Sequence, residues 1–240
     1  MTVQNVTKVA RKILKLKYCG AVIVAAGSAS RMGGIDKVMA PLKGEPMICH
    51  TVRAFQECDA IKEIVIVTRQ DLIIPISNLC KAFPKVKIVV AGGKSRQESV
   101  SLGLNALSGK VKLAAIHDGA RPLVSWQLID LTVRMAHNYG AAAPAVAVKD
   151  TIKVVEGGLA KETPERSKLR AVQTPQVFDL DLIRGALQKA KLDGAELTDD
   201  CSAIERMNMT VRILDGEETN IKVTTPMDLK LAELLLEERK

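Results

Sequence analysis

Short apolar runs alternate with amphipathic stretches along most of the chain, and this alternation predicts the fold class. Apolar stretches that predict strands occupy residues 22–24, 64–68, 86–91, 113–117 and 141–148, and the continuous runs at 22–24 and 64–68 are typical of strands covered on both faces. Helical patterns lie between them, over residues 46–57, 72–83, 96–107 and 126–138. Strands that alternate with helices of this length predict an α/β protein with a doubly wound, mostly parallel sheet.

Several residues mark where these elements begin or break. Pro46 suits the first turn of a helix, Pro75 interrupts the helical pattern around it, and Ser95 can cap the helix that follows it. Beyond residue 178 the patterns predict a helix over 179–191, a short helix over 199–207 capped by Thr198, a strand over 210–214 and a terminal helix that starts at 224–226.

The alternation stops at Lys149, and residues 149–175 indicate a β-hairpin arm. A turn at Glu156-Gly157-Gly158 separates two β-type segments, and the whole stretch is too short and polar to form its own core. Such an arm needs a surface to lie against, and a second copy of the chain is the economical candidate.

Composition and charge narrow the class of protein. The chain is 47% apolar, and no apolar run reaches the roughly 18 residues that a membrane span needs, so we expect no membrane segment. Residues 1–17 carry five cations and no acid, which leaves 8 − 5 = +3 for the rest, so no nucleic-acid footprint is required. We expect a basic extension over residues 1–19 and a single domain over 20–240.

The five cysteines form no Cys-x-x-Cys pair and are odd in number. They indicate free thiols in a reducing cytoplasm, with neither a disulfide framework nor a zinc site.

The first strand leads into a loop that is built for an anion. Ala25, Ala26, Gly27 and Ser28 remove side-chain bulk, so backbone N–H groups can approach a ligand closely. Cations follow in the same segment, at Arg31 and Lys37. Neither the dinucleotide fingerprint nor the Walker loop fits the sequence, because a required glycine is missing from each. The pattern favours a triphosphate site over an ordinary strand-to-helix loop only modestly.

Three loops of the chain follow the carboxyl ends of predicted strands. In a mostly parallel, doubly wound sheet, ligands bind at these strand ends. The loops begin near Ala25, Gly92 and Asp118, so they can share one crevice. Asp118 can hold Mg²⁺ there, because Mg²⁺ prefers one or two carboxylates plus phosphate oxygens; the plainer alternative is a structural pair with Arg121. His117 is better explained as a buried, hydrogen-bonded side chain than as a ligand or base.

Seven motifs occur in order and together resemble one family. They are Ala25-Ala26-Gly27 with Arg31-Met32 and Lys37, Gly92-Gly93 with Arg96 and Ser99-Val100, His117-Asp118-Gly119-Ala120-Arg121-Pro122, Asp150-Thr151-Ile152-Lys153, Thr174-Pro175-Gln176-Val177-Phe178, Thr198-Asp199-Asp200, and Asn220-Ile221-Lys222-Val223-Thr224. Over about residues 20–235 the chain resembles the 2-C-methyl-D-erythritol 4-phosphate cytidylyltransferases of the non-mevalonate isoprenoid pathway.

The resemblance implies a Rossmann-like nucleotidyltransferase fold, a homodimer with arm exchange, and cytidylyl transfer from CTP to methylerythritol phosphate with Mg²⁺. The catalytic cations it implies are Arg31, Lys37 and Lys222. Nucleotide-binding positions are Ala25, Ala26, Gly27, Ser28, Gly92, Gly93, Arg96, Ser99 and Gly119. Substrate-binding positions are Asp118, Arg121, Thr151, Arg166 and Lys222, with Asp118 also on the metal.

Some features depart from the family pattern. Ala29 replaces a second glycine, the gap from Arg31 to Lys37 is one residue shorter than in some members, and Thr219 stands where many members have Asp. Two rival functions remain open: a ribitol 5-phosphate cytidylyltransferase, and a nucleotide-binding protein without catalysis. A nucleic-acid binder that uses the basic extension would show strongly salt-dependent binding.

Overall fold

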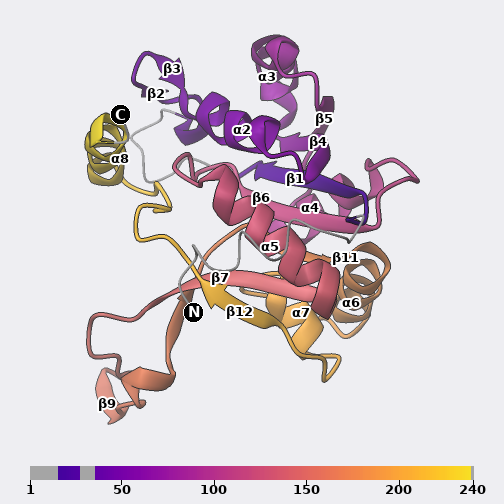
Figure 1. Cartoon of the computed structure of the whole chain (residues 1–240). Helices are drawn as coiled ribbons and strands as arrows, with labels where there is room; N and C mark the ends of the chain where they lie inside the picture. The colour runs from indigo at the N-terminus through magenta and orange to yellow at the C-terminus, as the bar shows by residue number, and fades with distance from the viewer. Residues whose placement is uncertain (1–15, 28–35, 239–240) are drawn as a thin grey trace.

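The computed structural model describes residues 16–27 and 36–238. Within these residues an eight-stranded sheet forms the centre of the molecule (Figure 1). Its strands are β1 (Cys19–Ala25), β4 (Ile61–Thr68), β5 (Val86–Ala91), β6 (Leu113–Asp118), β7 (Ala141–Ala147), β10 (Arg170–Val172), β11 (Gln176–Asp179) and β12 (Arg212–Asp215). The order is β10-β7-β11-β6-β1-β4-β5, and β12 also pairs with β7.

The sheet is mostly parallel, as the sequence predicts. β1 pairs in parallel with β4 and β6, β4 with β5, and β7 with β12. β10 and β11 run antiparallel to their neighbours. The carboxyl ends of β1, β5 and β6 therefore meet at one edge of the sheet.

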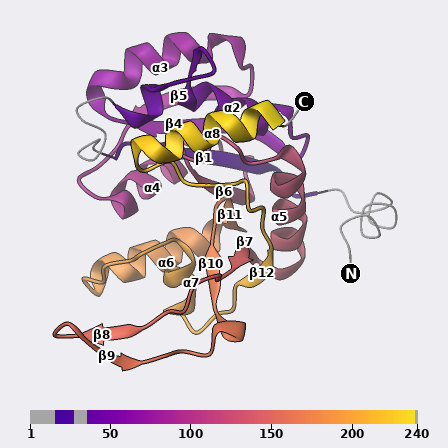
Figure 2. The same cartoon turned by 90° about the vertical axis from the view of Figure 1, so that its left-hand side faces the viewer.

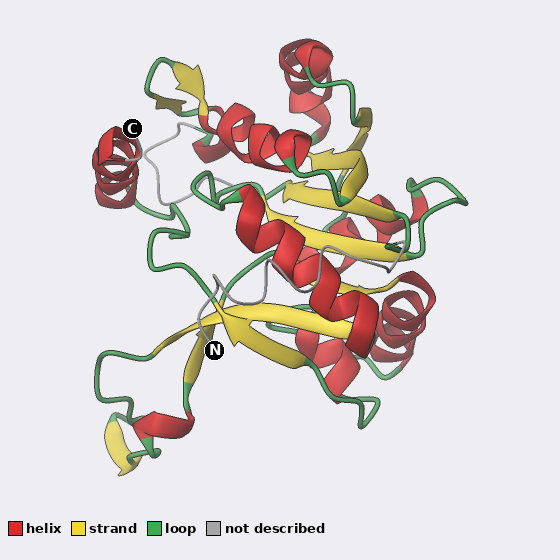
Figure 3. Cartoon of the chain, in the orientation of Figure 1, coloured by secondary structure: helices red, strands yellow, loops and turns green. Residues whose placement is uncertain are grey.

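Helices cover both faces of the sheet (Figure 3), which confirms the doubly wound class. One face packs against α2 (Met47–Glu57), α3 (Ile73–Leu79) and α5 (Trp126–Tyr139), and the other against α4 (Arg96–Asn105), α6 (Leu180–Leu192) and α7 (Cys201–Glu205). In β1, Ile23 joins the first core cluster and Val22 the second, because successive side chains of a strand point to opposite faces.

The helices α4, α5 and α6 begin at residues whose side chains cap them. The Ser95 hydroxyl accepts the Glu98 N–H at 3.1 Å, and Asp179 caps α6 in the same manner. The predicted cap at Thr198 is wrong: the N-cap position of α7 is Asp200, and the side chain that accepts a first-turn N–H, that of Ser202 at 3.0 Å, belongs to Asp199.

Two further sequence expectations need correction. Pro75 does not interrupt its helix, because α3 begins at Ile73 and places Pro75 in the first turn, where no N–H bond is lost. The short helical turns η2 (Gln70–Leu72) and η3 (Cys80–Ala82) flank it. β11 was not expected as a strand, yet it lies between β6 and β7 in the middle of the sheet.

The arm predicted over residues 149–175 begins as a hairpin that stands away from the body in both views (Figures 1 and 2), but its last residues return to the central sheet, where β10 pairs with β7 and Gln173 and Thr174 are buried. β8 (Val154–Glu156) and β9 (Leu159–Glu162) form a separate two-stranded sheet. Gly157 and Gly158 join them with positive φ values of 58° and 81°, which glycine adopts without strain. The turn η4 (Arg166–Lys168) leads back to β10.

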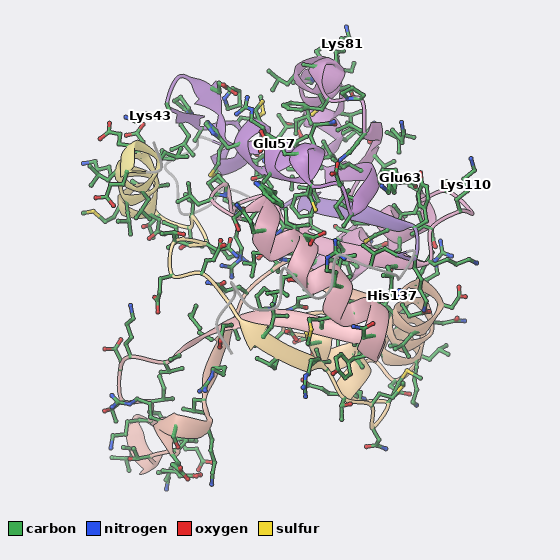
Figure 4. The ribbon with its side chains drawn as sticks, in the orientation of Figure 1. Lys43, Glu57, Glu63, Lys81, Lys110 and His137 are labelled. Carbon is green, nitrogen blue, oxygen red and sulfur yellow. The ribbon has the colours of Figure 1, made fainter. Side chains whose placement is uncertain are left out.

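The last helix, α8 (Pro226–Glu238), packs beside β2 (Pro41–Leu42), which forms a small two-stranded sheet with β3 (Glu45–Pro46). Lys43, in the turn between those two strands, forms an ion pair with Glu237 of α8 (Figure 4). Throughout the described part of the chain, every helix is too short or too polar to cross a membrane. All five cysteines lie in this part; they are free, as predicted, and all five are buried.

Candidate active site

A cavity of about 390 Å³ opens where the carboxyl ends of β1 and β6 meet the start of α4. It is the crevice that the strand-end loops predict. Its wall also includes the turn η1 (Lys37–Met39) and the segment that precedes α8. The lining residues are Val24, Ala25, Ala26, Gly27, Lys37, Val38, Gly93, Lys94, Ser95, Arg96, Ser99, Asp118, Ala120 and Lys222.

The small residues of this wall have a steric reason. A Cβ at Gly92 would stand 2.5 Å from the Ala26 Cβ, so a side chain there would push the two loops apart. At Gly119 an added Cβ would meet the Ala25 Cβ at 3.1 Å. Gly92 and Gly119 therefore lie behind the cavity wall and let the loops close, whereas Ala25, Ala26, Gly27 and Gly93 line it.

The loop before α4 lines the cavity and is held by hydrogen bonds of its own. The Gly93 N–H donates to the Ser99 hydroxyl at 3.1 Å, and that hydroxyl donates to the Ser95 carbonyl at 2.9 Å. These bonds hold the loop before α4 in place. A helix N-terminus carries partial positive charge and unpaired N–H groups, so a phosphate is the ligand that it favours.

Asp118 lies among three cations. Its carboxylate is 2.8 Å from Lys222 Nζ, 3.6 Å from Arg96 Nε and 3.7 Å from Arg121 Nε. Burial raises the pKa of Asp118, but the three cations outweigh it and lower that pKa to about 2. Asp118 is therefore ionised at neutral pH, and the cluster keeps a positive excess that suits a polyphosphate.

Arg96 is fixed by a partner that sequence reasoning missed. Asp200, which is fully buried, receives two parallel hydrogen bonds from the Arg96 guanidinium at 2.9 and 2.7 Å. Burial lowers the pKa of Arg96, but Asp200 and Asp118 outweigh it and raise that pKa overall. The motif Thr198-Asp199-Asp200 was the available signal, because a bidentate carboxylate partner is what a half-buried arginine needs.

Arg121 does not line the cavity. Its guanidinium donates to the Asn220 carbonyl at 2.7 Å. It therefore braces the segment that carries Lys222, in addition to facing Asp118. The sequence supports two interpretations of Asp118, a Mg²⁺ ligand or a structural pair with Arg121. Neither included its contact with Lys222, whose Nζ is the nearest cationic atom to the Asp118 carboxylate.

Lys37 occupies the first position of η1 and lines the cavity. Asp36 caps that turn by accepting the Val38 N–H at 3.0 Å, and Arg69 forms an ion pair with the same carboxylate. Arg69 also binds Asp71 at 2.8 Å. Asp36, the residue before Lys37, is therefore held both by the Val38 N–H and by Arg69. These contacts fix the turn from which Lys37 extends.

His117 is buried and hydrogen-bonded, as predicted. Its Nδ1 is 3.0 Å from the Thr174 hydroxyl, its Nε2 is 3.2 Å from the Arg121 carbonyl, and its ring packs on Phe55 with centroids 4.9 Å apart. Burial, which is the largest influence, lowers the pKa of His117 to about 4. The imidazole is neutral at physiological pH and takes no charge to the site.

The depressed pKa of His117 predicts an acid-sensitive stability. Between pH 6.5 and 4 the unfolded chain binds a proton at this residue and the folded chain does not, so the free energy of unfolding falls as pH falls through that window. The full effect is about 3 kcal/mol. Urea unfolding at pH 7, 5.5 and 4.5 measures it, and His117→Asn, which cannot titrate, is expected to show a shallower dependence. Identical slopes for both proteins would contradict the prediction.

The remaining predicted site residues fall into two groups. Thr151 and Arg166 are exposed on the arm and do not line the cavity of their own chain. Arg166 donates to the Lys149 carbonyl at 2.9 Å, which braces the base of the arm. Ser28 and Arg31 lie outside the described residues, as does most of the basic extension over residues 1–19.

The donor set around Asp118 fits Mg²⁺ only in company with a ligand. Within residues 16–27 and 36–238, no three His, Cys, Asp or Glu side chains come together in a cluster that could hold a metal ion. Asp118 and its three cations together carry a net positive charge, so the cluster repels a divalent ion that arrives without phosphate. With phosphate oxygens beside it, the same carboxylate completes the coordination that Mg²⁺ prefers.

Comparisons with known proteins agree on one family. The family model for IspD, 2-C-methyl-D-erythritol 4-phosphate cytidylyltransferase, matches residues 19–238. A protein of that name from Clostridium novyi is 44% identical over 226 residues, which cover 92% of this chain and 97% of the relative.

Solved structures lead to the same family. The crystal structure of 4-diphosphocytidyl-2C-methyl-D-erythritol synthase from Anaerococcus prevotii is similar with a TM-score of 0.83 and 30% identity, over 92% of this chain and 96% of that one. The 2-C-methyl-D-erythritol 4-phosphate cytidylyltransferase from Thermus thermophilus gives a TM-score of 0.78 and 31% identity, over 92% and 99%.

Proposed function

Because this chain belongs to the 2-C-methyl-D-erythritol 4-phosphate cytidylyltransferase family, we propose that the cavity between β1, β6 and α4 is where it binds CTP and methylerythritol phosphate. The protein is a CTP-dependent cytidylyltransferase of isoprenoid precursor biosynthesis. The observation that carries the placement is that small-residue loops and the cations Lys37, Arg96 and Lys222 line one cavity at the strand ends.

The reaction exchanges one phosphoanhydride bond for another. An oxygen of the methylerythritol phosphate group attacks the α-phosphorus of CTP and forms a new P–O bond. The bond from the α-phosphorus to the bridging oxygen breaks, and pyrophosphate leaves with that electron pair. The attacking phosphate is already an anion, so no general base is needed, and catalysis reduces to positioning and charge stabilisation.

Each cation has a place in that scheme. Lys222, beside Asp118, lies where it can bridge the nucleotide and the substrate phosphate. Lys37, together with Arg31, stabilises charge that develops at the α-phosphate and on the leaving pyrophosphate. Arg96 is held by Asp200 and keeps its charge at the mouth of α4, next to the N–H groups that favour phosphate.

The base and ribose require a different kind of surface. Ala25, Ala26, Gly27 and Gly93 line the cavity and carry little or no side chain, so the wall is mostly backbone at these positions. Backbone N–H and C=O groups read the edge of a base without bulk, which suits the smaller pyrimidine. Ser28 belongs to the same proposed surface by sequence. Gly92, Ser99 and Gly119 shape it from behind or at its edge.

Mg²⁺ is the metal that we propose, with Asp118 as its protein ligand and phosphate oxygens as the others. When bound, the ion neutralises charge on the triphosphate and helps to orient it. Asp118 also holds Lys222 at 2.8 Å, so the same carboxylate orients the cation nearest to it.

We further propose that the protein is a homodimer whose arms exchange. Residues 151–163 are exposed throughout, and they carry uncovered apolar side chains such as Val155 and Leu159, which are 57% and 67% exposed. A two-stranded hairpin is at best marginally stable alone. A second copy that covers it would receive Thr151 and Arg166 at its substrate phosphate.

Two organisational proposals complete the assignment. Residues 20–240 act as one catalytic domain, since the family match covers residues 19–238. The protein works in the cytoplasm, which the five free, buried thiols favour.

Pyrophosphate release tests the function directly. With Mg²⁺ and methylerythritol phosphate, we expect release with CTP and none above background with ATP, GTP or UTP. EDTA is expected to abolish the reaction. Ribitol 5-phosphate in place of methylerythritol phosphate serves as the discriminating acceptor. Turnover of ribitol 5-phosphate alone would overturn the substrate assignment, and no release from folded protein with either acceptor would favour a non-catalytic nucleotide-binding protein.

A further inference from the structure

We propose that Thr174 and His117 are positioning residues that fix the Asp118 backbone against the root of the arm. Thr174 lies just after β10, where the arm chain returns to the sheet, and just before β11. His117 is the neighbour of Asp118 at the end of β6. The inference rests on the proposed role of Asp118 in the cavity.

A continuous chain of hydrogen bonds joins the three residues. The Asp118 N–H donates to the Thr174 hydroxyl oxygen at 3.1 Å. That hydroxyl then has its own proton to give, and His117 Nδ1 accepts it at 3.0 Å. The remaining ring proton, on Nε2, is donated to the Arg121 carbonyl at 3.2 Å. This is the arrangement of protons that satisfies every group, and it requires the neutral imidazole.

Burial makes these bonds matter. His117 is 0% exposed and Thr174 is 4% exposed, so water does not replace a lost partner. A buried N–H left without an acceptor is destabilising, because it has lost its hydrogen bond to water and gained none in the protein. The loop that carries Asp118 would move to recover a partner, and the carboxylate would move with it.

The same root also holds the segment of Lys222. The Asn220 side chain donates to the Thr174 carbonyl at 2.9 Å, and the Arg121 guanidinium donates to the Asn220 carbonyl at 2.7 Å. Thr174 therefore lies between the two segments that bring Asp118 and Lys222 to within 2.8 Å of each other. Their relative position is set at the point where the arm joins the body.

Replacing the Thr174 hydroxyl tests this link with little change of shape. Thr174→Val is expected to lower kcat about tenfold with a much smaller change in KM for CTP, because a shift well under 1 Å misplaces charge without abolishing binding. Thr174→Ser, which keeps the hydroxyl, is expected to restore most of kcat. Thr132→Val is the matched control: Thr132 is likewise buried, at 0% exposed, but its hydroxyl donates to the Leu128 carbonyl within α5.

A pair of His117 variants separates the two ring contacts. His117→Asn places an acceptor near the position of Nδ1 and loses the donor to Arg121, whereas His117→Gln places a donor near Nε2 and loses the acceptor for Thr174. Because the bond to Thr174 is the one that leads to Asp118, we expect the Asn variant to retain more kcat than the Gln variant. Equal losses would contradict the proposed link.

Melting temperatures and Asp118→Asn distinguish the possible failures. A Thr174→Val protein that melts earlier but keeps wild-type kcat would show a purely structural role and overturn the inference. If Asp118→Asn is inactive in that case, the proposed site stands and only the link fails. If Asp118→Asn is fully active, the site assignment itself is wrong. Should Thr174→Val fail to fold, Thr174→Ser and the two His117 variants decide the question.

Discussion

Lys222→Met is expected to lower kcat by a factor of about 100 or more, because it removes a preorganised cation from the place where charge develops. Lys222 Nζ is 2.8 Å from Asp118, and its side chain is 41% exposed at the cavity. Methionine keeps the length and the apolar stem, so the loss reports the charge. Lys222→Arg keeps a cation and is expected to recover part of the rate.

The folding cost of this substitution is expected to be small. Asp118 keeps Arg96 at 3.6 Å and Arg121 at 3.7 Å, so its carboxylate is not left unpaired. Lys230→Met makes the same change at an exposed position of α8 and serves as the control. The steady-state rate of pyrophosphate release at saturating CTP gives kcat. An unchanged kcat in Lys222→Met, with folding intact, would exclude Lys222 from the reaction.

The buried strands were predictable because a strand that is covered on both faces has apolar residues at successive positions, and this continuous run is visible in the sequence. β5 (Val86–Ala91) also matches its predicted bounds, although its residues are half-buried or exposed and Lys87 interrupts its apolar pattern. β4 begins at Ile61, three residues before the predicted start at residue 64, because Glu63 hides the run. Glu63 is nevertheless buried, since its carboxylate accepts the N–H and hydroxyl of Ser108 at 2.7 and 2.6 Å.

β11 escaped prediction for a related reason. Val177 and Phe178 give it only two apolar residues, and Gln176 interrupts any run. The Gln176 side chain is buried because it accepts the backbone N–H groups of Asp200 and Cys201 at 3.0 and 3.1 Å. The hydrogen-bond partner Asp200 lies 24 residues further along the chain, so the sequence around Gln176 does not indicate that its side chain is buried.

Some features of the candidate site were likewise predictable from the sequence, and others were not. Its location follows from strand ends and small residues, and the family motifs identify Lys37, Asp118 and Lys222 without showing their spacing. The contacts between motifs were not predictable. Arg96 and Asp200 are 104 residues apart in the chain, and Asp118 meets Thr174 across 56. Such pairs depend on how the sheet brings distant segments together, and no local pattern encodes them.

For the homodimer proposed above, mixed dimers provide the second large expected effect. The arm of each chain is exposed, and neither Thr151 nor Arg166 lines the cavity of its own chain. If the arm serves the partner's cavity, a working site needs Lys37 from one chain and Arg166 from the other. We expect Lys37→Ala to lower kcat by about 100-fold and Arg166→Ala chiefly to raise KM for methylerythritol phosphate.

The two variants are to be co-expressed with different affinity tags, so that only mixed dimers survive two purifications. Each mixed dimer then has one site with both residues intact and one site with neither. At low methylerythritol phosphate, its activity is expected to be about half that of the wild-type dimer, far above either variant homodimer. A dimer that pairs Lys37→Ala with Lys168→Ala, two residues further along η4, should give the same half.

The outcome separates the two possible routes for the arm because each predicts a different pattern of intact sites. If Arg166 served its own chain, every site of the mixed dimer would lack either Lys37 or Arg166, and activity would stay at the mean of the two variant homodimers. The Lys168→Ala pairing would still give half, since one chain keeps both residues. Recovery in the first dimer as well as the second therefore requires that the arm cross to the partner, where the exposed Arg166 meets the phosphate that Lys222 faces from the other chain.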